Sequence, residues 1–503
     1  MIADVVRVAV VLVCGVGLWA ALRAFRGDRA LVWIVGLGFA ARACGSAILF
    51  WVSYLDFPLA SSLQLGGGHW FFAIDGVGYF ESAERAASAG PGAIWTLDPT
   101  LPSVFYIKTL ALSLYVFGRV VSSSMLLNLI AYLGTVLVLC RLADATGATR
   151  ATRVFVVSAV SFTPSWILWS TQPLKDTFFL MLVAAFVVAL HHTARATRVG
   201  RDALVSAVVA SAAAWALLYG VAGIRWYFAI LLLIATALTT VATTWLATGR
   251  RLRVGVALAI VLAALSQAVP AGAGPYLPDW ALDILHPWRG SAPSLAIAMV
   301  QAPAEAAAVA ERARQGLINS RGSTEIQLPP DPVAEAPALL PVADVSVPTD
   351  IAAATAVPDA PAPVQTAAPT AVRRPETTAQ KVFLGGVAMF VPRAIAQRAG
   401  WIYIGGGRGL LAFAELDTIV FTTSCLGAVL LVLIAVRRGL RPDPVFWSVL
   451  GLTVLIAVPL AYEATNFGTL IRQRNMVMLG FLLLPLLLGR PGDRRTSGAT
   501  TRA

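Results

Sequence analysis

Charged residues are scarce in this sequence of 503 residues, since Asp, Glu, Lys and Arg make up only 13% of it. A soluble domain carries roughly 25%. Histidine and cysteine are scarce as well, with four of each. All four cysteines lie in apolar runs, and the histidines lack the spacing of a metal site. The sequence therefore predicts neither a disulfide framework nor a histidine- or cysteine-based metal centre.

Apolar residues are abundant instead, at 58% of the chain, and the mean hydropathy is +0.76. Runs of about 20 apolar residues are long enough to cross a bilayer as helices, because lipid offers the backbone no hydrogen bonds. We therefore predict an all-α integral membrane protein with about eleven transmembrane helices. The first run lacks a basic start, so we interpret it as a retained helix and not as a signal peptide. The predicted spans are 3–22, 31–55, 122–141, 153–171, 175–191, 203–222, 226–247, 253–271, 412–436, 444–463 and 475–489.

The net charge of +12 comes from arginines in short segments between the predicted spans. If the spans alternate in direction, all of these segments fall on one side of the membrane, which is the positive-inside pattern. We therefore expect a plasma (inner) membrane protein with its N-terminus outside and its C-terminus in the cytoplasm, in contact with membrane lipids and not with nucleic acid. The arginine-rich segments are 23–30, 141–153, 191–202, 248–253, 437–444 and 490–503.

Two long segments fall on the predicted outer side. The middle of the second is dominated by Ala, Pro, Val and Thr, so we expect it to be disordered, although an Ala-rich helix over 296–318 is an alternative. The predicted regions are an N-terminal transmembrane region, 1–271, containing the first outer loop, 56–121; a second outer loop, 272–411, with its insert at about 300–380; C-terminal transmembrane helices, 412–489; and a cytoplasmic tail, 490–503.

Five cations lie where topology rules disfavour them. Lys175, Arg225, Arg472 and Arg474 fall in predicted outer turns, and Arg42 falls inside a predicted span. Cations around one outer cavity would suit a phosphate or pyrophosphate, which arginine binds in bidentate fashion. The alternative is that the turn cations extend along the lipid to the membrane surface, and that Arg42 pairs with an acid.

Two carboxylates on the outer side are candidates for chemistry. Asp75 lies between apolar residues close to the membrane surface, where it would suit a general base. Asp176 lies with Lys175 in a turn of only a few residues between two predicted spans. The alternatives are a turn residue for Asp75 and a helix N-cap for Asp176. We predict that both carboxylates converge with Arg225 and Arg472 on one outer cavity.

Short motifs occur in a fixed order through the first outer loop. None is specific alone, but their order and common placement are informative. They are Asp75-x-x-x-Tyr79-x-x-x-Ala83, Pro102-Ser-Val-Phe-Tyr106, Leu-Tyr-Val-Phe-Gly118 and Leu127-Asn128.

This arrangement resembles the bacterial membrane glycosyltransferases of the GT-C superfamily, the group of protein mannosyltransferases and lipid A aminoarabinose transferases (family 39-like). The turns that carry Lys175-Asp176, Arg225 and Arg472-x-Arg474 look like those of members linked to cell-envelope polysaccharide biosynthesis. The resemblance covers about 70–240 well and 412–489 loosely, and it implies a GT-C-like helical bundle with two large outer loops.

The resemblance also implies the chemistry. A sugar would pass, with inversion of configuration, from a polyprenyl-phosphate donor to a glycan, lipid or protein acceptor at the outer (periplasmic) face. Asp75 matches the essential first-loop acid and would act as the catalytic base. No cofactor is certain, although Asp75 and Asp176 could hold a divalent metal ion. The residues expected to bind substrate are Tyr79, Lys175, Asp176, Arg225, Arg472 and Arg474.

Two other functions fit part of the pattern. A polysaccharide polymerase or ligase would also present outer arginines, to a polyprenyl-pyrophosphate glycan. A lipid-linked sugar flippase or transporter would span the membrane as often, but transporters usually carry internal repeats, and we find none in this sequence.

Overall fold

Long apolar helices dominate the part of the chain that the computed structural model describes. Six helices are long and apolar enough to cross a membrane, and a bent pair of helices makes a seventh if it counts as one span. The six are α2 (Arg29–Tyr54), α6 (Val121–Thr146), α9 (Asp176–Ala196), α18 (Arg408–Arg437), α19 (Pro444–Glu463) and α20 (Phe467–Leu483). The described residues are 15–20, 23, 27–98, 101, 103–196, 202–246, 326–327, 378–399, 403–404, 408–463 and 467–489.

The predicted helical membrane protein is therefore confirmed, whereas the number of eleven spans stays a prediction. Two further predicted spans coincide with helices, α10 (Asp202–Ala222) and α11 (Trp226–Leu246). Several predictions fall wholly or mostly outside the described residues. They are the spans 3–22 and 253–271, the insert at about 300–380 with its alternative helix 296–318, and the tail 490–503.

The predicted span 153–171 is broken. Its two parts, α7 (Arg150–Phe162) and α8 (Pro164–Ser170), meet at an angle of 52°. The cause is Pro164, which lacks an N–H group and whose ring excludes the carbonyl of the preceding turn from normal helical bonding. The direction of the chain therefore changes inside the bundle, just before the segment that carries Lys175 and Asp176.

Short elements connect the long helices. Three pairs of short strands are antiparallel, β1 with β2, β3 with β4 and β5 with β6. The remaining elements are η1 (Ser61–Leu63), β1 (Gln64–Gly66), β2 (His69–Trp70), η2 (Phe71–Ala73), α3 (Asp75–Ala89), α4 (Pro91–Trp95), α5 (Val104–Phe117), β3 (Ile326–Gln327), α16 (Thr378–Phe390), α17 (Arg393–Arg398), β4 (Tyr403–Ile404), β5 (Arg441–Pro442), η4 (Leu484–Leu487) and β6 (Leu488–Gly489).

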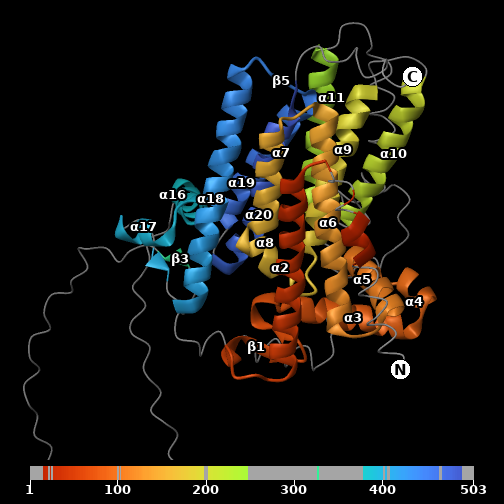
Figure 1. The fold of residues 1–503 in the computed structure, drawn as a ribbon, viewed down its shortest axis with the longest axis vertical. Coiled ribbons are helices and arrows are strands. Elements are labelled where there is room, and N and C mark those ends of the chain that lie inside the picture. Colours follow the sequence, from red (N-terminus) through yellow and green to blue (C-terminus); the bar gives the residue numbers. More distant parts are fainter. Residues whose placement is uncertain are drawn as a thin grey trace, which may run out of the picture.

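One end of the bundle is covered by the segment between α2 and α6. Helices α3, α4 and α5 and strand β1 gather there, at the bottom of Figure 1, and β5 lies at the opposite end. We call this the loop end, defined by residues 55–120, 171–175 and 223–225. The three segments touch, since the Phe105 N–H donates to the Gly223 carbonyl at 3.1 Å and Gln172 Nε2 donates to the Gly68 carbonyl at 3.4 Å.

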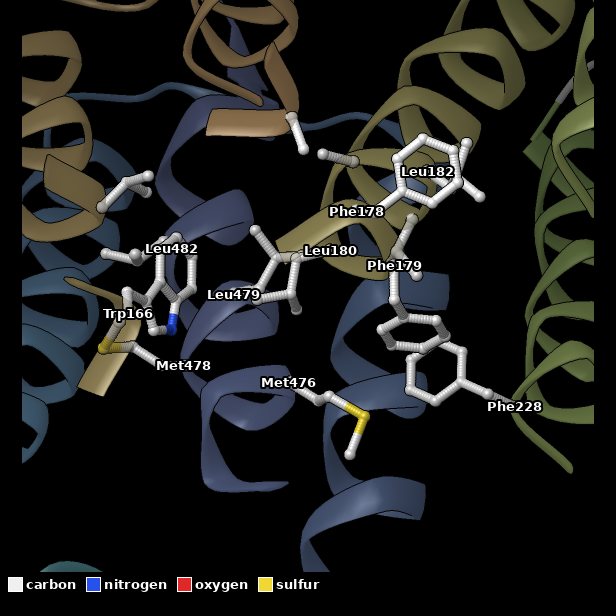
Figure 2. Packing of buried hydrophobic residues seen from close by; sticks show 14 of the residues in the cluster. Trp166, Phe178, Phe179, Leu180, Leu182, Phe228, Met476, Met478, Leu479 and Leu482 are labelled. Carbon is white, nitrogen blue, oxygen red and sulfur yellow. The ribbon is translucent and has the colours of Figure 1, made fainter. Parts of the chain in front are cut away.

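Helix α20 lies in the core of the bundle. It packs against α18 and α19 and also contacts α8 and α9. Figure 2 shows Met478 beside Trp166 of α8, and Met476 near Phe179 of α9 and Phe228 of α11. By contrast, α2 and α18 expose large apolar side chains such as Trp33 and Leu426, as lipid-facing helices do. Two polar side chains of α20, Arg474 and Asn475, are consequently buried in protein.

Candidate functional site

Asp75 is placed at the loop end by a close approach of two backbones. Helix α3 begins at Asp75, where a carboxylate is favoured by the helix dipole. The next residue, Gly76, packs so closely on the 171–175 segment that a Cβ there would lie 3.2 Å from Cγ of Pro173. The glycine thus brings Asp75 up to the residues that precede α9. Asp75 is the first residue of a helix, and the alternative of a simple turn residue is wrong.

Asp176 lies deeper than Asp75. It is the first residue of α9, and its side chain is 9% exposed, whereas the side chain of Asp75 is 48% exposed. Arg225, from the turn between α10 and α11, donates from Nη2 to Asp176 Oδ1 at 2.5 Å. The same guanidinium donates from Nη1 to the Tyr227 hydroxyl at 2.8 Å. A buried carboxylate of this kind requires such pairing, because desolvation of an unpaired charge is costly.

Arg472 joins the two carboxylates. Its Nε donates to Asp176 Oδ2 at 2.7 Å, and its Nη1 donates to Asp75 Oδ2 at 2.5 Å. The structure thus brings Asp75, Asp176, Arg225 and Arg472 together, as the sequence predicts, and we call these four residues the outer cluster, after the side of the membrane on which the sequence analysis expects them. The expected location of Arg472 in a turn before the span is wrong, because α20 begins at Phe467 and Arg472 lies within it.

Lys175 stands beside the outer cluster. Its Nζ donates to Ser103 Oγ at 2.5 Å and lies 5.1 Å from the centre of the Tyr79 ring. Burial, together with the neighbouring Arg225 and Arg472, lowers the pKa of Lys175 to about 8. Burial and the nearby Asp75 raise the pKa of Tyr79 to about 12, so its hydroxyl is neutral. Within the described residues Lys175 forms no ion pair with a carboxylate.

Arg474 lies outside the outer cluster. It is fully buried and donates from Nη2 to Asp417 of α18 and from Nη1 to Thr418 Oγ1 at 2.9 Å. Residues two apart on a helix point about 200° away from each other, so Arg472 and Arg474 cannot line one side of α20. A substrate-binding role for Arg474 stays a prediction, and the structure gives it a different partner.

Arg42 does not pair with an acid within the described residues. It is 1% exposed and donates to the backbone carbonyls of Gly38, Val160 and Ser161, and its guanidinium carbon lies 4.0 Å from the centre of the Tyr132 ring. These contacts account for its position inside a membrane helix.

Two residues in these contacts were not singled out from the sequence. Ser103 has φ +63°, the left-handed region that non-glycine residues rarely adopt, and it accepts from Lys175 and donates to the Ile224 carbonyl at 3.1 Å. Ser103 lies in the motif that begins at Pro102, and that motif could have directed attention to it. Asp417 lies within a predicted span, where a carboxylate calls for a partner, so the pairing with an intramembrane arginine could have been proposed.

The arrangement suits an anionic ligand. Lys175, Arg225 and Arg472 carry three positive charges against the two carboxylates, which leaves one positive charge in surplus. Asp75 is open to solvent at the rim. Asp75 and Asp176, considered above for a divalent ion, both accept from Arg472, and among the described residues no group of three or more His, Cys, Asp or Glu could hold a metal ion.

Comparisons with known proteins identify no relative, since no family model, no curated protein and no solved structure matches this chain. The function is therefore argued from the geometry of the outer cluster and from the resemblance noted in the sequence.

Proposed function

We propose that this protein is a membrane glycosyltransferase of the GT-C type. It transfers a sugar from a polyprenyl-phosphate donor to an acceptor at the extracytoplasmic face, in cell-surface polysaccharide or glycoconjugate assembly. In this proposal the loop end faces outward and the arginine-rich ends of the helices face the cytoplasm. The N-terminus is outside and the C-terminus inside.

The observation that carries the proposal is the double hydrogen bond of Arg472 to Asp75 and Asp176. Arg472 lies 397 positions after Asp75 and 296 positions after Asp176. The three residues meet at the end of a membrane bundle, where a lipid-linked substrate could reach them. A half-exposed carboxylate beside a group of cations supplies both a base for an acceptor hydroxyl and a site for a phosphate leaving group.

The chemistry follows from these positions. The acceptor oxygen attacks the anomeric carbon while Asp75 takes its proton, and the bond from that carbon to the phosphate oxygen breaks. The leaving polyprenyl phosphate changes from a diester with one negative charge to a monoester with up to two. Lys175, Arg225 and Arg472 stabilise this increase in charge. Attack from the side opposite the phosphate inverts the configuration.

The charge balance favours this donor over a pyrophosphate. One surplus positive charge matches the single negative charge of a sugar phosphodiester, whereas a pyrophosphate diester carries two. The proposal therefore places a monophosphate-linked sugar in the site.

The test is transfer by the purified full-length protein in nanodiscs, with labelled polyprenyl-phosphate sugars and a mixture of glycan, lipid and peptide acceptors. The wild type should form a glycosidic bond, and Asp75→Asn should lose transfer by a factor of about 10²–10⁴. Glu84→Gln, a carboxylate change farther along α3, is the matched control and should keep full activity.

Three outcomes count against the proposal. Full transfer by Asp75→Asn contradicts the catalytic base. Transfer only from pyrophosphate-linked glycans supports the polymerase or ligase. Movement of the labelled lipid across sealed vesicles without a new glycosidic bond supports a transporter.

A further inference from the structure

The break between α7 and α8 leaves backbone groups that need partners inside the membrane. Pro164 has no N–H for the Val160 carbonyl. The Ser165 N–H, which would bond to the Ser161 carbonyl in a continuous helix, donates instead to Asp417 Oδ1 at 2.7 Å. An unsatisfied carbonyl in an apolar surrounding is costly, so a bend here requires other donors.

Arg42 of α2 supplies those donors. Its Nη2 donates to the Val160 carbonyl at 2.9 Å, and its Nη1 donates to the Ser161 carbonyl at 2.8 Å. The guanidinium thus stands at the C-terminal end of α7, where the helix dipole favours a cation. Tyr132 of α6 covers its face. One side chain therefore satisfies two carbonyls at the C-terminal end of α7.

Asp417 and Arg474 bind the start of α8, on the C-terminal side of the break. Asp417 accepts from the Ser165 N–H through Oδ1 and from Arg474 through Oδ2, and both charged side chains are 0% exposed. Ser165 Oγ bonds to Asn475 Oδ1 at 2.9 Å. Arg474 also donates to the Met389 carbonyl of α16 at 3.4 Å. The first turn of α8 is therefore joined to α18 and α20.

We propose that Arg42, Asp417 and Arg474 form a positioning hub for the outer cluster. The hub holds α8 at its angle to α7, and α8 leads within a few residues to Lys175 and Asp176. It also sets the rotation of α20, so that Arg472, on the other side of that helix, points at Asp176. Both partners of the Arg472–Asp176 pair are thus aligned by one buried network.

The hub explains why α20 carries two arginines two positions apart. Apolar contacts alone define the rotation of a helix less strictly than a buried ion pair, which is satisfied in one geometry. Fixing a unique arrangement is the best-supported use of such pairs. In this view Arg474 determines the direction of Arg472 and does not itself touch substrate.

The test is hydrogen–deuterium exchange on the full chain in nanodiscs. Asp417→Leu with Arg474→Met removes both charges together, which avoids an unpaired buried charge and keeps the variant folded. Exchange should rise by about fivefold to tenfold in a peptide covering 163–176, the effect of losing a buried hydrogen bond at Ser165. Exchange across α5 should not change.

Asp417→Asn combined with Arg474→Met separates the two attachments without leaving a buried charge unpaired. The remaining oxygen can still accept from the Ser165 N–H, but the ion pair with Arg474 is lost. Exchange should then rise in a peptide covering 467–476 and stay slow at 163–170. Thr423→Val on the same α18 is the matched control, because its hydroxyl bonds only to carbonyls of its own helix, and it should change neither peptide.

A kinetic measurement adds a readout that simple destabilisation would not move. If the hub orients the cluster, the double variant should lower kcat by at least about tenfold with little change in KM at a temperature where it is fully folded. This readout rests on the proposed function, whereas the exchange readout does not. A wild type that transfers no sugar would reject the function, and the exchange data would still decide on the hub.

Two results would overturn the inference. One is unchanged exchange at 163–176 in the folded double variant. The other is a rise spread evenly over all helices, α5 included, which marks a general loss of stability and not a lost attachment.

Discussion

The outer cluster and the positioning hub use the same chemistry in opposite surroundings. Arg472 and Arg474 stand two residues apart on α20, and each binds a carboxylate from another helix. Arg472 is 15% exposed and bonds to two acids, one of which is half open to solvent. Arg474 and Asp417 are both 0% exposed and are enclosed by protein.

The difference indicates which pair can change partners. An arginine at the rim can exchange a carboxylate for an incoming phosphate, because solvent hydrates Asp75 and Arg225 still pairs with Asp176 when Arg472 leaves them. A fully buried pair has no such exchange, since separating it would leave two desolvated charges. This difference supports the two proposals, that the outer cluster carries the chemistry and that the hub aligns it, and four predictions test them.

The largest effect on stability is expected when one member of the buried Arg474–Asp417 pair is removed. Arg474→Met leaves Asp417 charged and enclosed, so the free energy of unfolding should fall by about 3–5 kcal/mol. Replacing Asp417 with Leu as well should recover much of that loss. Denaturant unfolding of the reconstituted protein measures both. A single variant as stable as the wild type would contradict the comparison.

Arg472→Met should affect activity more than stability, the opposite of Arg474→Met. Asp176 keeps Arg225 and Asp75 keeps solvent, so the protein should stay folded with a smaller loss of stability than Arg474→Met. Transfer should nevertheless fall by a factor of about 10²–10³, as expected when one donor to the developing charge is removed. Arg438→Met, at the opposite end of the bundle, is the control. Equal activity in the Arg472 and control variants would show that the outer cluster does not stabilise the leaving group.

The third prediction concerns pH. The pKa of Lys175 is lowered to about 8, so its ammonium group is present below pH 8 and is lost as the pH rises above it. Binding of a short-chain polyprenyl phosphate should therefore be strongest between about pH 6, where the phosphate loses its second proton, and pH 8, and should weaken above pH 8 by up to about tenfold per pH unit. Lys175→Arg should remove this decline, because arginine stays charged. A wild-type affinity that is constant from pH 6 to 10 would exclude Lys175 from the site.

The smallest effect is expected at Gly76. Gly76→Ala adds a Cβ 3.2 Å from Pro173 and should move Asp75 slightly, lowering transfer by about threefold to tenfold. Gly78→Ala is the matched control, because a Cβ there meets nothing within 4 Å, and Ala in place of Gly stabilises a helix by up to about 1 kcal/mol. Indistinguishable kinetics of the two variants would mean that the spacing of α3 from the 171–175 segment is not critical.

The sequence alone determined much of the local structure. Apolar runs located α2, α6, α9, α18 and α19 to within a few residues, because a membrane helix is specified by its own length and hydropathy. The same reasoning drew attention to Asp75, Asp176, Arg225 and Arg472, since charges are conspicuous in an apolar chain. It was less successful at the ends of α20, where two arginines made helical residues look like a turn.

Only the tertiary structure decided which charge meets which. Arg472 and Arg474 are almost identical in sequence context, yet the helix directs them to opposite sides, one to Asp75 and Asp176 and the other to Asp417. The break at Pro164 needed Arg42, which lies more than 100 positions earlier in the chain. Hydropathy and spacing describe one segment at a time, whereas a buried charge is satisfied by whichever helix packs beside it, and that depends on how all the helices are arranged.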